Sequence, residues 1–311
     1  METERRFEIE LPDSGRIVWR FQGDVPVSRL KTLRRLIKPS AVAPASPVAT
    51  EVSVRRRPFT EREEFGTAPS RTILRTHRLS ARMTAADRVE ILLHETGDET
   101  LLRELYTLQR IIWYGFLPLL LRRKLLVLHG SLLALDGRGV LLCGSSGSGK
   151  STCARRVPAP WRALADDAVL LSAAEDGIYA QGLPTWSRLL PGRTGPRVDV
   201  NDRVELSGLY HLAQSPEDRI GTLTGSEAIN VVIRSFLDFS GIWKIHPGNA
   251  LRRDISLAAM DFAQYANRRA DTGRLHCTLH GEFWKELEGR LSAAPLIRRS
   301  ETEASYGVSS H

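Results

Sequence analysis

The chain lacks several features that would assign it to a class at once. It has only three cysteines, Cys143, Cys153 and Cys277, and they show neither a CxxC pair nor the spacing of a metal site. This usage predicts a reduced, cytoplasmic protein. The most apolar run, residues 111–121, has eleven residues, whereas a membrane helix needs about 20. Residues 1–6 are charged and show no apolar signal core. We therefore expect no membrane span.

Strong charge segregation is also missing. The formal net charge of +8 comes from 44 Lys and Arg against 36 Asp and Glu, spread along the 311 residues. Such an excess could attract nucleic acid, anionic lipid or an acidic peptide. Because it forms no block, a generally basic surface explains it equally well, and we expect no specific nucleic-acid partner. The length and the 42% of hydrophobic residues allow one large domain or two smaller ones.

One glycine-rich segment carries the strongest chemical signal. Residues 144–151 read GSSGSGKS, which matches the pattern G-x-x-x-x-G-K-[ST] of a phosphate-binding loop. An apolar run at 140–143 precedes it as a predicted strand, and residues 152–157 follow as a short helix before Pro158. In such loops, glycines let backbone N–H groups surround an anion. Lys150 then reaches the phosphates and the Ser151 hydroxyl binds Mg²⁺. The segment predicts ATP·Mg²⁺ binding.

Patterning along the chain predicts an α/β protein with three parts. Residues 1–85 are expected to form a small β-rich lobe, residues 86–297 a kinase-like domain, and residues 298–311 a disordered tail. The predicted strands lie at 7–21 (as a hairpin), 51–56, 72–79, 125–128, 131–135 and 168–171. The predicted helices lie at 98–124, interrupted at Pro118, and at 251–269 and 281–291.

Three further features draw interest because of their place relative to the loop. His129 lies fifteen residues before Gly144, so its strand and the loop's strand can be sheet neighbours; a histidine there could orient a nucleophile or stabilise charge, or be merely structural. In the adjacent pair Asp166-Asp167, one carboxylate can bind metal while the other accepts a proton. Taken alone the pair would be read as a solvated turn, but the phosphate-binding loop upstream reverses that preference. Arg188 and Arg193 are weak candidates for a phosphate clamp.

Four segments taken together resemble the HPr kinase/phosphorylase superfamily. They are Leu128–Ser131, the loop Gly144–Ser151, Leu164–Asp167, and Lys244–Asn249 followed by Ser256–Asp261. The resemblance covers about residues 125–265 and implies a serine kinase with a phosphoenolpyruvate carboxykinase-like fold, a mixed sheet with flanking helices. Within the superfamily the chain is most similar to HPr-kinase-like proteins of peptide-modification cassettes, of the SynChlorMet and lasso-peptide types. The segments that carry this similarity are Ser148–Arg156, Trp161, Asp166-Asp167 and Pro184–Ser187.

The resemblance also implies roles for particular residues. It implies a serine of a protein or ribosomal precursor peptide as phosphate acceptor, and it leaves a homo-oligomer open. Asp167 is the expected base, Asp166 and Ser151 the expected metal ligands, and His129 and Lys150 further catalytic residues. The nucleotide is expected to contact Gly144, Ser145, Ser146, Gly147, Ser148, Gly149, Lys150, Ser151 and Thr152.

Two departures from the superfamily pattern narrow the expected activity. Thr152 stands where kinase/phosphorylase members usually carry glutamate, and their glycine-rich signature after the Asp pair has no counterpart here. We therefore expect a kinase without the reverse, phosphate-removing reaction. A nucleotide-binding regulatory module that transfers nothing and a small-molecule kinase remain the alternatives.

Overall fold

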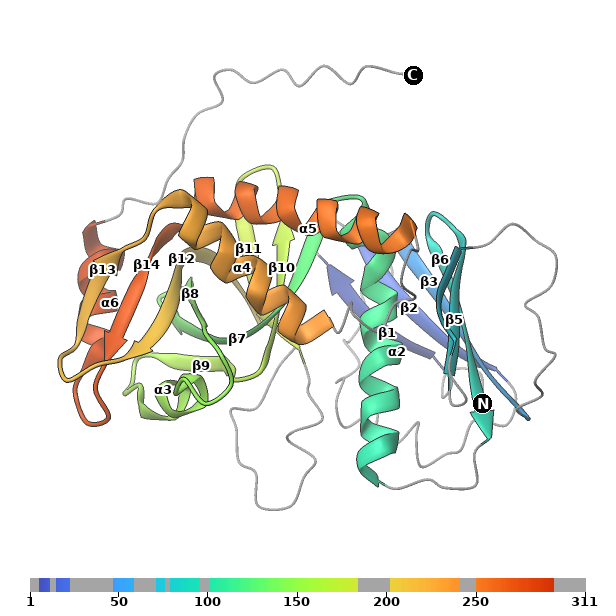
Figure 1. Cartoon of the computed structure of the whole chain (residues 1–311), viewed down its shortest axis with the longest axis horizontal. Coiled ribbons are helices and arrows are strands. Elements are labelled where there is room, and N and C mark those ends of the chain that lie inside the picture. Colours follow the sequence, from blue (N-terminus) through green and yellow to red (C-terminus); the bar gives the residue numbers. More distant parts are fainter. Residues whose placement is uncertain are drawn as a thin grey trace.

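The computed structural model describes residues 6–11, 15–22, 47–58, 71–75, 79–95, 101–183, 202–240 and 250–293. Within these ranges the chain is a mixed α/β protein with two mixed sheets (Figure 1), so the predicted fold class is confirmed at this level. The predicted tail at 298–311 lies outside the described residues, as do residues 184–201 and 241–249.

The first sheet contains six strands in the order β1-β2-β3-β6-β5-β4. Their bounds are β1 (Arg6–Leu11), β2 (Gly15–Gln22), β3 (Val48–Pro58), β4 (Arg71–Arg75), β5 (Leu79–Ala85) and β6 (Arg88–Glu95). The hairpin predicted at 7–21 is confirmed, since β1 and β2 pair antiparallel with Phe7 opposite Trp19. The single strand predicted at 72–79 is wrong, because β4 and β5 are separate antiparallel strands. The sheet continues through β6 to Glu95, past the predicted lobe boundary at residue 85.

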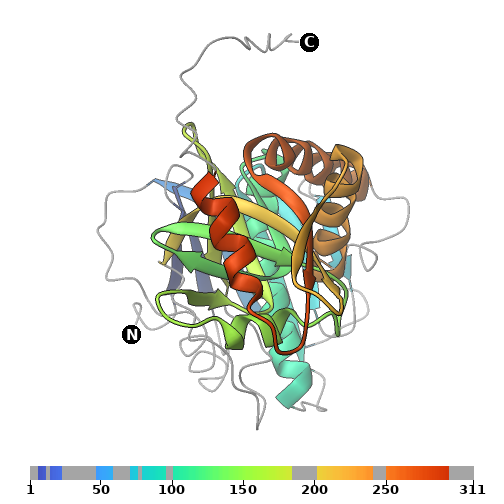
Figure 2. The same cartoon turned by 90° about the vertical axis from the view of Figure 1, so that its left-hand side faces the viewer.

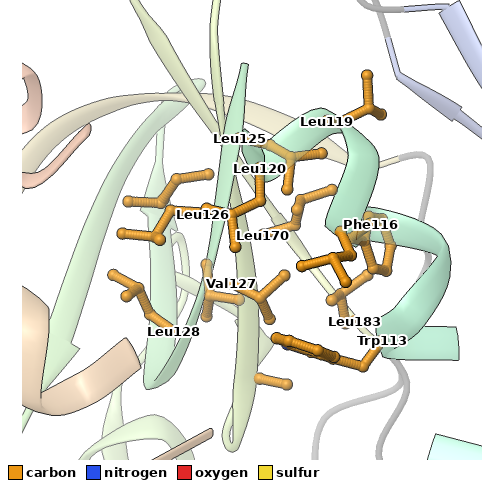
Figure 3. Close-up of a cluster of buried hydrophobic side chains, with 14 of the residues drawn as sticks. Trp113, Phe116, Leu119, Leu120, Leu125, Leu126, Val127, Leu128, Leu170 and Leu183 are labelled. Carbon is orange, nitrogen blue, oxygen red and sulfur yellow. The ribbon is translucent and has the colours of Figure 1, made fainter. Parts of the chain in front are cut away.

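Helix α2 (Leu101–Leu121) joins the two sheets. On one side the buried Trp19 of β2 donates a hydrogen bond from Nε1 to the Ile111 carbonyl oxygen, at 3.0 Å. The helix approaches so closely at Gly115 that a Cβ atom there would lie 2.5 Å from the Trp19 ring. On the other side α2 contributes to the apolar cluster of Figure 3, in which the labelled side chains are Trp113, Phe116, Leu119, Leu120, Leu125, Leu126, Val127, Leu128, Leu170 and Leu183.

The second sheet contains eight strands and carries the glycine-rich segment. Its order is β11-β10-β7-β8-β12-β14-β13, with β9 paired to β7 and β11 paired also to β12. Through that last pairing, five strands close into a ring. The bounds are β7 (Leu125–Leu135), β8 (Arg138–Cys143), β9 (Arg162–Ala165), β10 (Ala168–Ala173), β11 (Ile178–Gly182), β12 (Arg203–Gln214), β13 (Arg219–Thr222) and β14 (Asp271–Cys277).

Strand β7 is one continuous strand, so the break predicted at His129-Gly130 is wrong. Gly130 pairs with Cys143 of β8, and a Cβ atom at Gly130 would lie 2.8 Å from Leu141 Cδ1. Glycine at this position therefore allows close packing and does not mark a turn. Successive side chains of β7 enter different cores: Leu132 packs in the cluster shared with the first sheet, and Leu133 in a second cluster on the opposite face.

Four helices pack on the second sheet. Helices α4 (Gly225–Ser240) and α5 (Ala250–Arg269) contact β7, and α5 runs along the molecule to α2 (Figure 1). The short α3 (Lys150–Arg156) and α6 (Phe283–Ala293) supply side chains to the second cluster, and Figure 2 shows α6 in front of the strands. The helices predicted at 251–269 and 281–291 are thus confirmed within about two residues. Among the described helices, none is long and apolar enough to cross a bilayer.

Candidate functional site

The glycine-rich segment forms a tight loop between β8 and α3. Gly147 and Gly149 have φ angles of 82° and 106°, in the left-handed region that favours glycine. At Gly147 a Cβ atom would meet nothing within 4 Å, so the need for glycine there is conformational. Gly144 is required by space, because its Cβ atom would lie 2.7 Å from Ser148 Oγ. The three glycines of the motif therefore each match a local geometric demand.

Lys150 is the first residue of α3 and lies inside this loop with only 5% of its surface exposed. Its Nζ atom donates hydrogen bonds to the carbonyl oxygens of Gly144 at 2.7 Å and Ser145 at 2.9 Å. Burial lowers the pKa of Lys150, while the negative charges of Asp167 and Asp238 oppose that shift. The ammonium group is thus held in the loop, within the field of two carboxylates.

The Asp166-Asp167 pair lies in the bend between β9 and β10, beside the loop. The Ser151 hydroxyl donates to the Asp166 carbonyl oxygen at 3.4 Å, and the Gly130 backbone N–H donates to the Asp167 carbonyl oxygen at 3.1 Å. The bend removes the strand constraint that would force the two side chains to opposite faces. The pair therefore lies between α3 and β7, next to the glycine-rich loop.

His129 faces Asp167 across the β7–β10 pairing. Its Nδ1 atom lies 3.4 Å from Asp167 Oδ1, and both side chains are half-buried. Burial lowers the pKa of His129, and Lys150 lowers it further, against the opposing effects of Asp167 and Asp238. Since the ordinary histidine pKa is about 6.5, the imidazole is neutral near pH 7. A neutral imidazole beside a carboxylate can orient it by hydrogen bonding without neutralising its charge.

Helix α4 adds residues that the sequence did not single out. Ser235 is buried and donates a hydrogen bond from Oγ to the His129 carbonyl oxygen, at 2.5 Å. Asp238, one turn further on, is exposed, and its charge opposes the lowering of the His129 and Lys150 pKa values by burial. On β12, His211 pairs with Cys143 at the start of the loop. An acidic residue on an amphipathic helix carries no distinctive signal, so only the packing of α4 on β7 reveals these neighbours.

The other predicted site residues differ in how exposed they are and in whether they lie within the described ranges. Ser145 and Ser146 are exposed, whereas Ser148, Ser151 and Thr152 are partly buried. Within the described ranges, no group of three or more His, Cys, Asp or Glu side chains could hold a metal ion by itself. The candidate segments Pro184–Ser187 and Lys244–Asn249, with Arg188 and Arg193, lie outside the described residues.

Replacing Asp238 with Asn should lower the pKa of His129, because the substitution removes a negative charge that favours the imidazolium form. The imidazole would then titrate at lower pH than in the wild-type protein. An NMR titration, with the resonance assigned through a His129→Gln variant, measures this. Asp261→Asn is the matched control, since Asp261 pairs with Arg123 and should leave the His129 titration in place. An unchanged His129 pKa in Asp238→Asn would contradict the electrostatic link to α4.

These elements define a mixed α/β protein with a glycine-rich loop, a buried lysine and a histidine–aspartate pair at the β7–β10 pairing of its second sheet. A family model described as SynChlorMet cassette protein ScmC matches residues 97–292, more than half of the chain. The chain belongs to this ScmC family. No curated protein matches the chain. The family supports the peptide-modification cassette context expected from the sequence, and the match includes α2, the loop, the Asp pair and the helices through α6.

Proposed function

We propose that the protein is an ATP-dependent kinase that transfers the γ-phosphate to a serine hydroxyl of a protein or ribosomal precursor peptide. The observation that carries the proposal is that the GSSGSGKS loop lies next to the His129–Asp167 pair. The first is a phosphate-binding pattern and the second offers a carboxylate as base. Transfer of a phosphoryl group to a hydroxyl needs both within one site.

The loop fits a nucleotide triphosphate. Its left-handed glycines leave Ser145 and Ser146 exposed at its outer turn, and backbone N–H groups in such turns bind anions. The buried Ser148 Oγ lacks a hydrogen-bond partner among the described residues, and Lys150 Nζ bonds only to loop carbonyl oxygens. Residues 144–152 would hold the phosphates, with Lys150 placed to offset their charge. The bound nucleotide would supply the phosphoryl group for transfer.

Magnesium would be held by Ser151 and Asp166. A hydroxyl and a carboxylate are oxygen ligands of the kind Mg²⁺ prefers, and Mg²⁺ commonly completes its shell with waters and nucleotide phosphates. Ser151 already contacts the Asp166 main chain, so the two residues lie side by side without forming an all-protein metal cage. That arrangement agrees with a metal that enters together with the nucleotide.

Asp167 would accept the proton of the substrate serine hydroxyl, and His129 would orient its carboxylate. The carboxylate lies next to the His129 imidazole and near enough to Lys150 to raise the pKa of its ammonium group. Because the imidazole is neutral near pH 7, it can donate a hydrogen bond to the carboxylate and hold its orientation. Catalysis would then consist mainly of positioning and of charge stabilisation on the phosphate.

The proposal is tested by incubating the full-length protein with γ-labelled ATP, Mg²⁺ and the precursor peptides encoded in the same cassette. We expect label on a serine of one peptide, located by mass spectrometry. A peptide with that serine changed to alanine is the matched control and should stay unlabelled. Measured ATP binding without transfer to any peptide would overturn the kinase assignment in favour of a regulatory module. Label appearing instead on a metabolite from cell extract would identify a small-molecule kinase.

A further inference from the structure

Two cysteines face each other beneath the glycine-rich loop. Cys153 on α3 and Cys277 at the end of β14 are 124 residues apart, yet their Sγ atoms lie 3.8 Å from each other. Both side chains are buried, in the second core cluster. We propose that Cys153 and Cys277 form a redox-active dithiol that a peroxide oxidises to an intramolecular disulfide. This inference is independent of the proposed kinase activity.

The geometry needs only a local adjustment to form the bond. A disulfide places its sulfur atoms about 2.05 Å apart, so the two sulfurs must approach by less than the diameter of one atom. Cys277 is the last residue of β14, which is held between β12 and β13. Cys153 lies in the middle of the seven-residue helix α3. Closing the remaining gap requires rotation of the two side chains or a shift of α3 toward β14.

A fixed positive charge lies beside the two thiols. The Arg156 guanidinium group donates to the carbonyl oxygens of Thr278, at 2.8 Å, and Gly281, and Thr278 directly follows Cys277 in the chain. Positive charge near a thiol favours the thiolate, which is the nucleophile in thiol oxidation. Either sulfur of the contact can attack first, and the other then resolves the product.

The β14 end of the pair lies nearer the surface than the α3 end. Cys277 keeps 7% of its surface exposed, and two residues further Leu279 is 67% exposed. Cys153 is only 3% exposed, so a compact reagent such as hydrogen peroxide is favoured over a bulky disulfide. The third cysteine, Cys143, is fully buried on β8, where burial raises its pKa to about 11. It therefore serves as an internal, unreactive reference.

The proposed reaction proceeds in two balanced steps. One thiol of the pair loses its proton, and its thiolate attacks one oxygen of hydrogen peroxide. The O–O bond breaks, and the hydroxide that leaves takes up the released proton, which gives water and a cysteine sulfenic acid. The second sulfur then attacks the sulfenic sulfur, the S–O bond breaks, and the departing hydroxide takes up the second thiol proton as water. Two thiols are oxidised by two electrons, and one peroxide is reduced to two waters.

The site of this bond gives it a structural consequence. Cys153 follows Lys150 by three residues on α3, and the Cys153 backbone N–H donates to the Gly149 carbonyl oxygen at 2.8 Å. A cross-link would tie the helix that begins at Lys150 to β14. The oxidation state of the pair therefore bears on the freedom of the loop to adjust around an anion.

The test is peroxide treatment of the folded full-length protein, followed by denaturation, alkylation of free thiols and peptide mapping. We expect one free thiol to remain per chain, a linked peptide pair that contains Cys153 and Cys277, and full recovery of thiols on reduction. Cys143→Ser should form the same link. Cys153→Ser and Cys277→Ser should each fail to form the link, and the remaining thiol of the pair should accumulate sulfenic and higher oxides, because its partner is gone.

Three results would overturn the proposal. One is retention of all thiols at a peroxide concentration that oxidises free cysteine in the same tube. Another is a link between two chains and not within one. The third is oxidation of Cys143 in preference to the Cys153–Cys277 pair. Circular dichroism of the treated wild-type protein verifies that the bond forms in the folded state, and the Cys143→Ser result keeps the test informative if the Cys277→Ser variant folds poorly.

Discussion

Replacement of Lys150 by alanine is expected to abolish phosphate transfer to peptide. The ammonium group is buried in the loop and bonds to the carbonyl oxygens of Gly144 and Ser145, so it is placed where phosphate charge would be stabilised. Removal of one preorganised donor of this kind costs roughly 10²–10³ in kcat, and here a full positive charge is lost as well. The labelled-ATP assay, with protein in excess over peptide, measures the rate directly.

Two companion variants separate loss of chemistry from loss of structure. Lys150→Met keeps most of the apolar stem and should fail to the same extent, because only the charge and its donors are missing. Lys124→Ala removes an exposed lysine just before β7, away from the loop, and should transfer phosphate at the wild-type rate. Thermal unfolding followed by circular dichroism reports whether the Lys150 variants are folded. A folded Lys150→Ala protein with wild-type turnover would refute the role given to the loop.

The loop is the part of the site that the sequence predicts best, for a physical reason. Its geometry depends on backbone conformations that are local, and the left-handed angles at Gly147 and Gly149 leave few residues other than glycine. A pattern of glycines read along the chain therefore carries nearly the whole loop. The strand before the loop and the short helix after it are equally local, and β8 and α3 match their prediction.

Contacts between segments that are distant in the chain could not be predicted from the sequence. No helix was predicted at α4, and no local pattern indicates that this segment packs on β7, so Ser235 and Asp238 were not identified from the sequence. The spacing of Cys153 and Cys277 gives no hint of their contact, because 124 residues separate them. In β7 the pair His129-Gly130 resembles a break. Its glycine is explained only by the close approach of Leu141 on a neighbouring strand.

The Asp166-Asp167 pair is less predictable from the sequence than the loop, and more predictable than the contacts between distant segments. Its composition alone is that of a solvated turn, and its position beside the loop was expected from family resemblance and chain order. The structure places Asp167 opposite His129 because β10 pairs with β7 with Ala168 facing His129. A strand pairing of this kind depends on apolar side chains along both strands and not on the acidic residues themselves. The packing of the uncharged neighbours of Asp167 therefore determines where its carboxylate lies.

Asp167→Asn is expected to eliminate phosphate transfer while leaving nucleotide binding largely intact. The amide has nearly the same shape as the carboxylate and can still hydrogen-bond His129, but it cannot accept the proton of a serine hydroxyl. General base catalysis contributes about 10²–10⁴ to a rate, and a loss of that size should appear in single-turnover transfer. Titration calorimetry with ATP and Mg²⁺ should give a dissociation constant close to that of the wild-type protein.

Asp136→Asn makes the same chemical change at a place without a proposed role. Asp136 lies exposed in the β7–β8 turn with a φ of 49°, a conformation that asparagine tolerates well, so folding and transfer should be unaffected. A second readout comes from His129, whose pKa the Asp167 charge raises; in Asp167→Asn the imidazole should titrate at lower pH. If this variant showed the shifted His129 titration but transferred phosphate at the wild-type rate, the electrostatic contact between Asp167 and His129 would be correct. The assignment of Asp167 as the base would then be wrong.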